Sequence, residues 1–211
     1  MNLPNKLSLM RVLLVPIFMV FTIIDNVWTR LFALIIFIAA ALTDIYDGYV
    51  ARKWGLITTF GKFIDPLADK FLISAALICF VDLKEIHVPA WMVVLIIGRE
   101  FLITGLRLVG ASKGVIIPAD KSGKFKTTSQ IISIIMILII LCVNSLLNHF
   151  YGVEAPDLLN LSGGYYFGGW ILNWLPYWLI FITTLLTLIS GINYLYKNRY
   201  LFSEDLKSKN I

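Results

Sequence analysis

The sequence predicts an all-α membrane protein, a bundle of six transmembrane helices with both termini in the cytoplasm. Three observations support this fold class. The 211-residue chain is 59% hydrophobic and only 15% charged, whereas soluble proteins are roughly 45–50% apolar and about 25% charged. Its apolar residues form six runs, each close to the ~20 residues that a helix needs to cross a bilayer. Its lysines and arginines gather in alternate connections between these runs, as expected when basic residues stay cytoplasmic.

The six predicted spans cover residues 7–24, 31–50, 60–83, 88–108, 127–147 and 171–196. The first run has basic flanks but no small-residue cleavage site after it, so it is predicted to be a retained helix. The connections are short except for residues 148–170, whose Gly, Tyr and Trp content predicts an external interfacial loop. Short connections favour a single domain over residues 1–211. Cys79 and Cys142 lie in spans without a Cys/His cluster, which favours packing over a disulfide or zinc.

The distribution of basic residues predicts the orientation. With a cytoplasmic N-terminus, the cytoplasmic side holds most of them: Lys6, Arg52, Lys53, Lys62, Lys113, Lys121, Lys124, Lys126, Lys197, Arg199, Lys207 and Lys209. Only Arg30 and Lys84 fall in the opposite connections. The net charge of +5 then favours anionic lipid headgroups and phosphorylated substrates. Nucleic acid is not a predicted partner, because no separate basic domain is present to bind it.

Four aspartates interrupt the apolar pattern in residues 43–70, TDIYDGYVARKWGLITTFGKFIDPLADK. Asp44 and Asp47 are three residues apart, and Asp65 and Asp69 are four apart. On helices each pair shares a face, so two helices joined by a turn near residues 53–59 could aim all four carboxylates at one point.

The chemistry of such a group points to metal ions and phosphate. Four close carboxylates in a low-dielectric region need compensating positive charge, and their oxygens are the ligands that magnesium and manganese prefer. Two divalent ions held there would leave coordination sites for a diphosphate and favour displacement at phosphorus. Intramembrane carboxylates are costly and normally functional. Gly48, Ala51 and Gly61 either leave room for a substrate or serve as small helix-contact residues, and Arg52 could contact phosphate.

This stretch closely resembles the signature of the CDP-alcohol phosphatidyltransferase family, with its four aspartates, the DG and AR pairs and the lone Gly. The resemblance implies a six-helix membrane enzyme, often a homodimer, that transfers a phosphatidyl group from CDP-diacylglycerol to an alcohol and releases CMP. It implies two divalent cations, Mg²⁺ or Mn²⁺, and makes Asp69 both a metal ligand and the base that deprotonates the acceptor. The remaining roles that it implies are metal ligation by Asp44, Asp47 and Asp65, and a CDP site lined by Asp44, Gly48, Ala51 and Arg52, with Gly61 opposite.

A second polar block, residues 98–130, reads GREFLITGLRLVGASKGVIIPADKSGKFKTTSQ. Arg99 and Arg107 are eight residues apart and therefore near one face of the fourth span, and arginines inside a span normally point to the bundle interior. Lys121, Lys124 and Lys126 follow in the predicted cytoplasmic connection. Such cations facing the aspartates would suit an acceptor that itself carries a phosphate. Two other interpretations stay open: Arg99 pairs with Glu100 or an aspartate, and the lysines only reflect the positive-inside bias.

The block resembles the bacterial phosphatidylglycerophosphate synthase branch of the family in its RE pair, GLR, GKFKT and the following Gln, as does the N-terminal LPNKLSLMR. This implies sn-glycerol-3-phosphate as acceptor, a bacterial inner membrane, and an active site that faces the cytoplasm. It also implies that Arg99, Arg107, Lys124 and Lys126 contact the acceptor phosphate. The alternatives are a cardiolipin, phosphatidylserine or phosphatidylinositol-phosphate synthase, a membrane prenyltransferase, or a cation transporter whose aspartates bind the transported ion.

Overall fold

The computed structural model describes the backbone of residues 3–54, 59–112, 121–153, 157–160 and 164–199. Within these ranges, its description leaves out the side chains of residues 3–8, 44–69, 109, 111–112, 121–124, 160 and 164–166.

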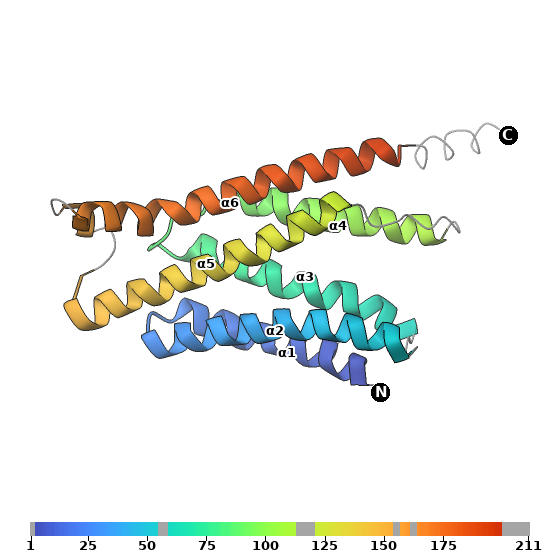
Figure 1. Cartoon of the computed structure of the whole chain (residues 1–211), viewed down its shortest axis with the longest axis horizontal. Coiled ribbons are helices and arrows are strands. Elements are labelled where there is room, and N and C mark those ends of the chain that lie inside the picture. Colours follow the sequence, from blue (N-terminus) through green and yellow to red (C-terminus); the bar gives the residue numbers. More distant parts are fainter. Residues whose placement is uncertain (1–2, 55–58, 113–120, 154–156, 161–163, 200–211) are drawn as a thin grey trace.

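The described residues form six α-helices and one short 3-10 helix, with no strand (Figure 1). In chain order these are α1 (Leu3–Ile23), α2 (Val27–Trp54), α3 (Thr59–Asp82), α4 (Ala90–Ser112), α5 (Lys121–Tyr151), the 3-10 helix η1 (Asp157–Asn160) and α6 (Gly164–Lys197). Each predicted span overlaps one α-helix, which confirms the all-α prediction and the number of helices in the described chain.

Helix ends are less well predicted than helix centres. The α5 helix has 31 residues, which corresponds to a length of about 46 Å, whereas the hydrocarbon core of a bilayer is about 30 Å thick. Hydropathy therefore locates only the middle of such a helix. For the same reason the predicted loop 148–170 was too long, since α5 continues to Tyr151, η1 follows, and α6 begins at Gly164.

Local signals explain where two of the helices stop and start. The Asn26 side-chain oxygen accepts a hydrogen bond from the Trp28 backbone N–H at 2.9 Å, the geometry of an N-cap at the start of α2. Gly152, with φ 61°, follows the last residue of α5. Its N–H donates to the Asn148 carbonyl at 3.0 Å, so it ends α5 in the left-handed conformation that glycine adopts without strain.

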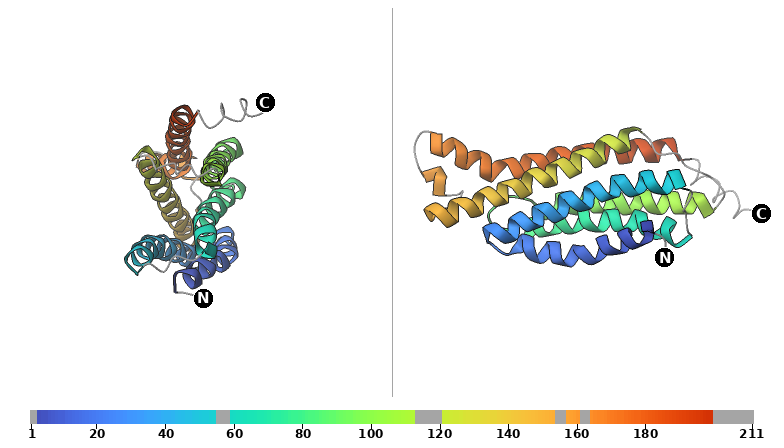
Figure 2. Two further views of the ribbon diagram at one scale, coloured as in Figure 1. Left: turned by 90° about the vertical axis from the view of Figure 1, so that its right-hand side faces the viewer. Right: turned by 60° about the horizontal axis from the view of Figure 1, so that its bottom comes forward.

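The six α-helices pack as an elongated bundle in which successive helices run in opposite directions (Figures 1 and 2). The α3 helix packs against α1, α4 and α5, while α6 packs against α4 and α5. The beginnings of α1, α3 and α5 lie at the same end of the bundle as the ends of α2, α4 and α6 (Figure 1). We call this the motif end, because Asp44 and Asp47 precede the end of α2, and Asp65 and Asp69 follow the start of α3.

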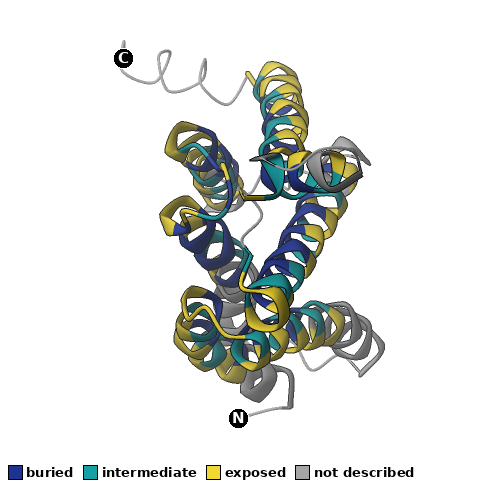
Figure 3. Ribbon diagram, turned by 90° about the vertical axis from the view of Figure 1, so that its left-hand side faces the viewer, coloured by how far each residue is buried: buried dark blue, intermediate teal, exposed yellow. Residues whose placement is uncertain are grey.

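The buried faces of the helices point inward (Figure 3), and most of the buried residues among those described are apolar. Phe18 and Phe37 pack with ring centroids 5.8 Å apart. Large apolar side chains also cover the outside: Leu13 is 62% exposed, Val94 67% and Ile192 65%. Among the described residues, two segments, Phe125–Tyr151 and Phe167–Lys197, are long and apolar enough to cross a membrane.

An ionic network ties the helices together at the end opposite the motif. Arg30, predicted to lie in a connection, is in the first turn of α2, with its side chain only 1% exposed. Its guanidinium donates to both carboxylate oxygens of Glu85 at 2.5 and 2.6 Å and to the Leu141 carbonyl at 3.2 Å. It also lies 3.1 Å from Asp25, which accepts a hydrogen bond from Ser145 at 2.7 Å. These contacts join α2 and α5 to the turns that precede α2 and α4.

Candidate active site

The four predicted metal ligands lie in two consecutive helices. Asp44 and Asp47 belong to α2, and Asp65 and Asp69 belong to α3. Both helices run unbroken through their pair, which confirms the helical spacing on which the shared-face argument depends. The side chains of these aspartates and of Ala51, Arg52 and Lys124 lie outside the described part of the structure, as do the surroundings of Gly48 and Gly61. The convergence of the four carboxylates and the CDP site therefore stay predictions.

The described part of the site begins at Lys70, the residue after Asp69. Its ammonium group donates to the Thr104 hydroxyl and, at 3.2 Å, to the Glu100 backbone carbonyl. It also lies 3.6 Å from the Glu100 carboxylate. These contacts attach the motif helix α3 directly to the middle of α4.

Glu100 is the centre of a group of polar side chains from three helices. Its carboxylate forms an ion pair with Lys126 of α5, whose side chain is 3% exposed. Arg99 lies 3.8 Å from the same carboxylate, and the Gln130 side-chain amide donates to it at 3.4 Å. We refer to Lys70, Arg99, Glu100, Lys126 and Gln130 as the Glu100 cluster.

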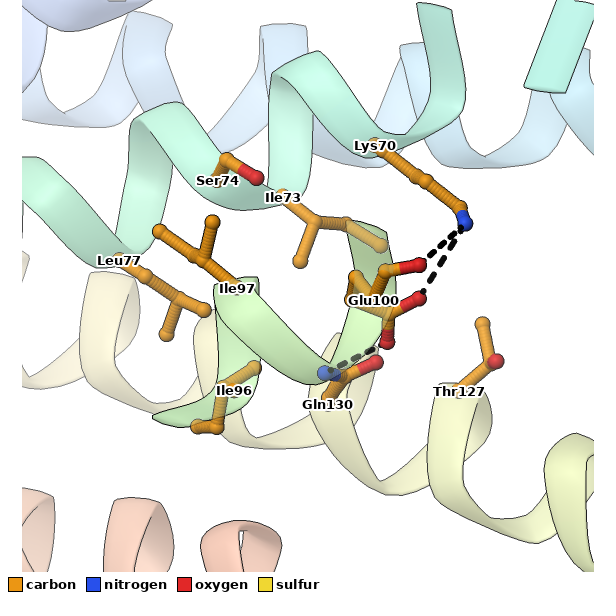
Figure 4. Close-up of a pocket in the computed structure, with 9 residues that line it drawn as sticks. All are labelled: Lys70, Ile73, Ser74, Leu77, Ile96, Ile97, Glu100, Thr127 and Gln130. Atoms are coloured by element: carbon orange, nitrogen blue, oxygen red, sulfur yellow. Dashed lines mark hydrogen bonds and ion pairs between the residues drawn. The ribbon is translucent and has the colours of Figure 1, made fainter. Parts of the chain in front are cut away.

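A cavity of about 150 Å³ lies beside this cluster (Figure 4). Its polar end is formed by Lys70, Glu100, Thr127 and Gln130, and its other end is apolar. The apolar lining consists of Ile73, Leu77, Ile96 and Ile97, with Ser74 beside them. The cavity is therefore bordered by α3, α4 and α5. Its polar end includes Lys70, which follows Asp69 in the chain.

Arg99 and Arg107 both contact α6. Arg99 donates to the Ser190 hydroxyl at 2.9 Å, and Arg107 donates through Nε to the Tyr194 hydroxyl at 3.2 Å. The Arg107 guanidinium also lies 5.4 Å from the centre of the Tyr194 ring. Because Ser190 and Tyr194 are one helical turn apart, the prediction that the two arginines share a face of α4 is confirmed. Their burial differs, since the Arg99 side chain is 12% exposed whereas Arg107 is exposed.

Basic side chains outnumber acidic ones among the described side chains around Glu100. Four basic side chains (Lys70, Arg99, Arg107 and Lys126) accompany one carboxylate, that of Glu100. Since charges in a partly buried setting interact strongly, this arrangement favours the entry of an anion.

The structure corrects the expected setting of the lysines. They were predicted to lie in a connection, but α5 begins at Lys121 and includes all three. Lys126 is buried within the bundle and paired with Glu100, so it is more than a topological signal. The interpretation in which Arg99 pairs with Glu100 is also confirmed, and Arg99 makes a second contact with Ser190.

Several residues of the site were not among those predicted. Glu100 had a usable signal, because a carboxylate inside an apolar span is costly and normally has a function. Lys70 follows the last aspartate of the motif, and its charge was the only feature of the sequence that indicated a place in the site. Ser190 and Tyr194 gave no signal, because their role depends on how α6 packs against α4. They lie 91 and 87 residues away in the chain from the arginines that they contact.

The carboxylates of the motif are the candidate metal ligands. Among the side chains that the structure describes, no three His, Cys, Asp or Glu residues are grouped as metal ligands. The four aspartates of α2 and α3 are outside that set. By chemistry they offer hard carboxylate oxygens, which suit Mg²⁺ and Mn²⁺.

Comparison with known proteins identifies the family of the chain. Residues 1–182 match the family model described as CDP-alcohol phosphatidyltransferase. A Bacillus subtilis protein named CDP-diacylglycerol–glycerol-3-phosphate 3-phosphatidyltransferase is 49% identical over an alignment that covers 65% of this chain and 77% of that protein. A Rickettsia bellii protein of the same name is 32% identical, with 92% of this chain and 93% of the relative covered. The chain therefore belongs to the CDP-alcohol phosphatidyltransferase family.

Proposed function

We propose that this protein transfers the phosphatidyl group of CDP-diacylglycerol to sn-glycerol-3-phosphate and releases phosphatidylglycerophosphate and CMP. The names of the relatives support this reaction. The choice of acceptor depends on one observation: Lys70, Arg99 and Lys126 surround Glu100 beside a cavity. Lys70 is also the residue that follows Asp69 in the chain.

The charge of the acceptor fits this region. A phosphate monoester carries a charge of about −1.5 to −2 at neutral pH and offers strong acceptor oxygens. Guanidinium groups bind such oxygens in a bidentate manner, and lysine adds a point charge. Arg99, Arg107 and Lys126, with Lys124 at the start of α5, are the residues that would hold the phosphate.

The aspartates would act on the other substrate. Asp44, Asp47, Asp65 and Asp69 would hold two divalent cations, Mg²⁺ or Mn²⁺, which when bound neutralise the diphosphate and stabilise charge at the reacting phosphorus. Gly48, Ala51 and Gly61 would leave room for the CDP group, and Arg52 would contact its phosphates. Asp69 takes the proton of the acceptor hydroxyl, whose oxygen forms a bond to the β-phosphorus while the bond from that phosphorus to the CMP oxygen breaks.

The same proposal places the whole chain, residues 1–211, in a bacterial inner membrane as one domain with six spans. The apolar side chains exposed on the outside of the bundle support contact with lipid tails. The lysines and arginines at the motif end favour a cytoplasmic active site and cytoplasmic termini. A homodimer is part of the proposal because the family resemblance implies it.

The test is CMP release by the purified protein in detergent or lipid, with CDP-diacylglycerol and Mg²⁺ or Mn²⁺. Acceptors are supplied singly: glycerol-3-phosphate, phosphatidylglycerol, serine, inositol phosphate, or none. The proposal predicts release with glycerol-3-phosphate and its loss with a chelator. Release only with another acceptor would keep the family chemistry and refute the acceptor assignment. An absence of release with every acceptor would refute the proposed reaction.

A further inference from the structure

The side chain of Arg99 lies directly against the backbone of Gly191 in α6. A Cβ atom at position 191 would be 3.0 Å from Arg99 Cγ, 3.3 Å from Nε and 3.7 Å from Cδ. Side-chain carbons are rarely this close to a neighbour, so even an alanine would push the arginine by a few tenths of an ångström. The missing side chain of Gly191 thus provides the space in which Arg99 lies.

Neighbouring residues of α6 hold the functional ends of the same arginines. Ser190 accepts a hydrogen bond from Arg99 Nη2 at 2.9 Å, and Tyr194 accepts one from Arg107 Nε at 3.2 Å. The Tyr194 ring also lies under the Arg107 guanidinium. Residues 190 and 194 share a face of the helix because they are four apart, and Gly191 adjoins that face. We call Ser190, Gly191 and Tyr194 the α6 strip.

We propose that the α6 strip positions Arg99 and Arg107 for the phosphate of the acceptor, so that α6 determines acceptor affinity without contacting the acceptor. This rests on the proposed function. Both arginines have long, flexible side chains whose ordering opposes binding. Contacts that fix them before the acceptor arrives remove part of that cost. Ser190, Gly191 and Tyr194 are therefore positioning residues and act through the arginines.

The substitution Gly191→Ala tests this with a small and defined change. Because alanine favours a helix more than glycine does, a loss of function would not come from a weaker α6. The matched control is Gly168→Ala in the same helix, since a Cβ there meets nothing within 4 Å. We expect Gly191→Ala to raise the KM for glycerol-3-phosphate about three- to tenfold, the cost of ordering one side chain, and to leave kcat and the KM for CDP-diacylglycerol within about twofold. Gly168→Ala should match the wild type.

A double-mutant cycle separates positioning from a general packing defect. In an Arg99→Ala background, Gly191→Ala should have no further effect on the KM for glycerol-3-phosphate. An additive effect, an equal rise in both KM values, or an unchanged KM in the single variant would each overturn the proposal. Ser190→Ala provides a second variant should Gly191→Ala fail to fold, and it is expected to raise the same KM.

A binding readout keeps this test distinct from that of the proposed reaction. Inorganic phosphate should raise the midpoint of thermal unfolding of the wild type by binding the folded protein, and it should raise that of Gly191→Ala less. A wild type that does not use glycerol-3-phosphate refutes the reaction. A wild type and a Gly191→Ala variant stabilised equally by phosphate refute the role of the α6 strip.

Discussion

Replacement of Glu100 by glutamine should destabilise the protein, because the carboxylate is shared by three cations. Lys70 and Arg99 lie 3.6 and 3.8 Å from its oxygens, and Lys126 forms a closer ion pair. At an effective dielectric constant of about 20, each of the two longer pairs corresponds to a gross attraction of about 4 to 5 kcal/mol. Desolvation offsets much of this, but removal of one partner of a buried pair typically costs about 3 to 5 kcal/mol.

The cost should appear as a lower midpoint of thermal unfolding in detergent. For a chain of this size, 1 kcal/mol corresponds to about 2 to 4 °C, so the predicted fall for Glu100→Gln is about 6 to 20 °C. Inorganic phosphate should restore part of it, because an added anion can pair with the cations that the carboxylate leaves behind. The control is Asp82→Asn, which removes an exposed carboxylate at the end of α3. A change of less than about 2 °C in Glu100→Gln would refute the view that Glu100 holds the cluster together.

Three further substitutions test the ionic network around Arg30 and the roles proposed for Asp69 and Arg107. Arg30→Met should lower the free energy of unfolding by about 3 to 5 kcal/mol, measured by thermal unfolding, whereas Lys84→Met, which removes an exposed charge nearby, should not. Asp69→Asn should abolish CMP release while CDP binding, followed by equilibrium dialysis, is largely retained; normal turnover would exclude an obligatory base at this position. Arg107→Ala should raise the KM for glycerol-3-phosphate about tenfold or more, the worth of a charged hydrogen bond, and an unchanged KM would remove Arg107 from the acceptor site.

The sequence was sufficient to predict the helices, because each of the six apolar runs is close to the length that a helix needs to cross a bilayer. It also placed Arg99 and Arg107 on one face, since a spacing of eight residues is close to two helical turns. These are local properties, and the geometry of a single helix determines them. The spacing of the four aspartates is of the same kind, and their helical setting is confirmed.

Contacts between segments that are far apart in the chain could not be predicted from the sequence. Gly191 lies against the Arg99 side chain, and Ser190 accepts a hydrogen bond from its guanidinium. Both contacts depend on which face of α6 packs against α4. Likewise, Arg30 was predicted to lie in a connection because the apolar run of the second span begins at the next residue, Leu31. The structure buries it, since a carboxylate from the turn before α4 neutralises its charge. Such pairings arise only when the helices are assembled.

The central claim is that the phosphate of the acceptor is bound by Arg99, Arg107, Lys124 and Lys126. It is tested most directly by equilibrium binding of radiolabelled glycerol-3-phosphate to the wild type and to Arg99→Ala. The account predicts that the variant binds glycerol-3-phosphate at least about tenfold more weakly, with its affinity for CDP-diacylglycerol unchanged. Equal affinity of the two proteins for glycerol-3-phosphate would contradict it.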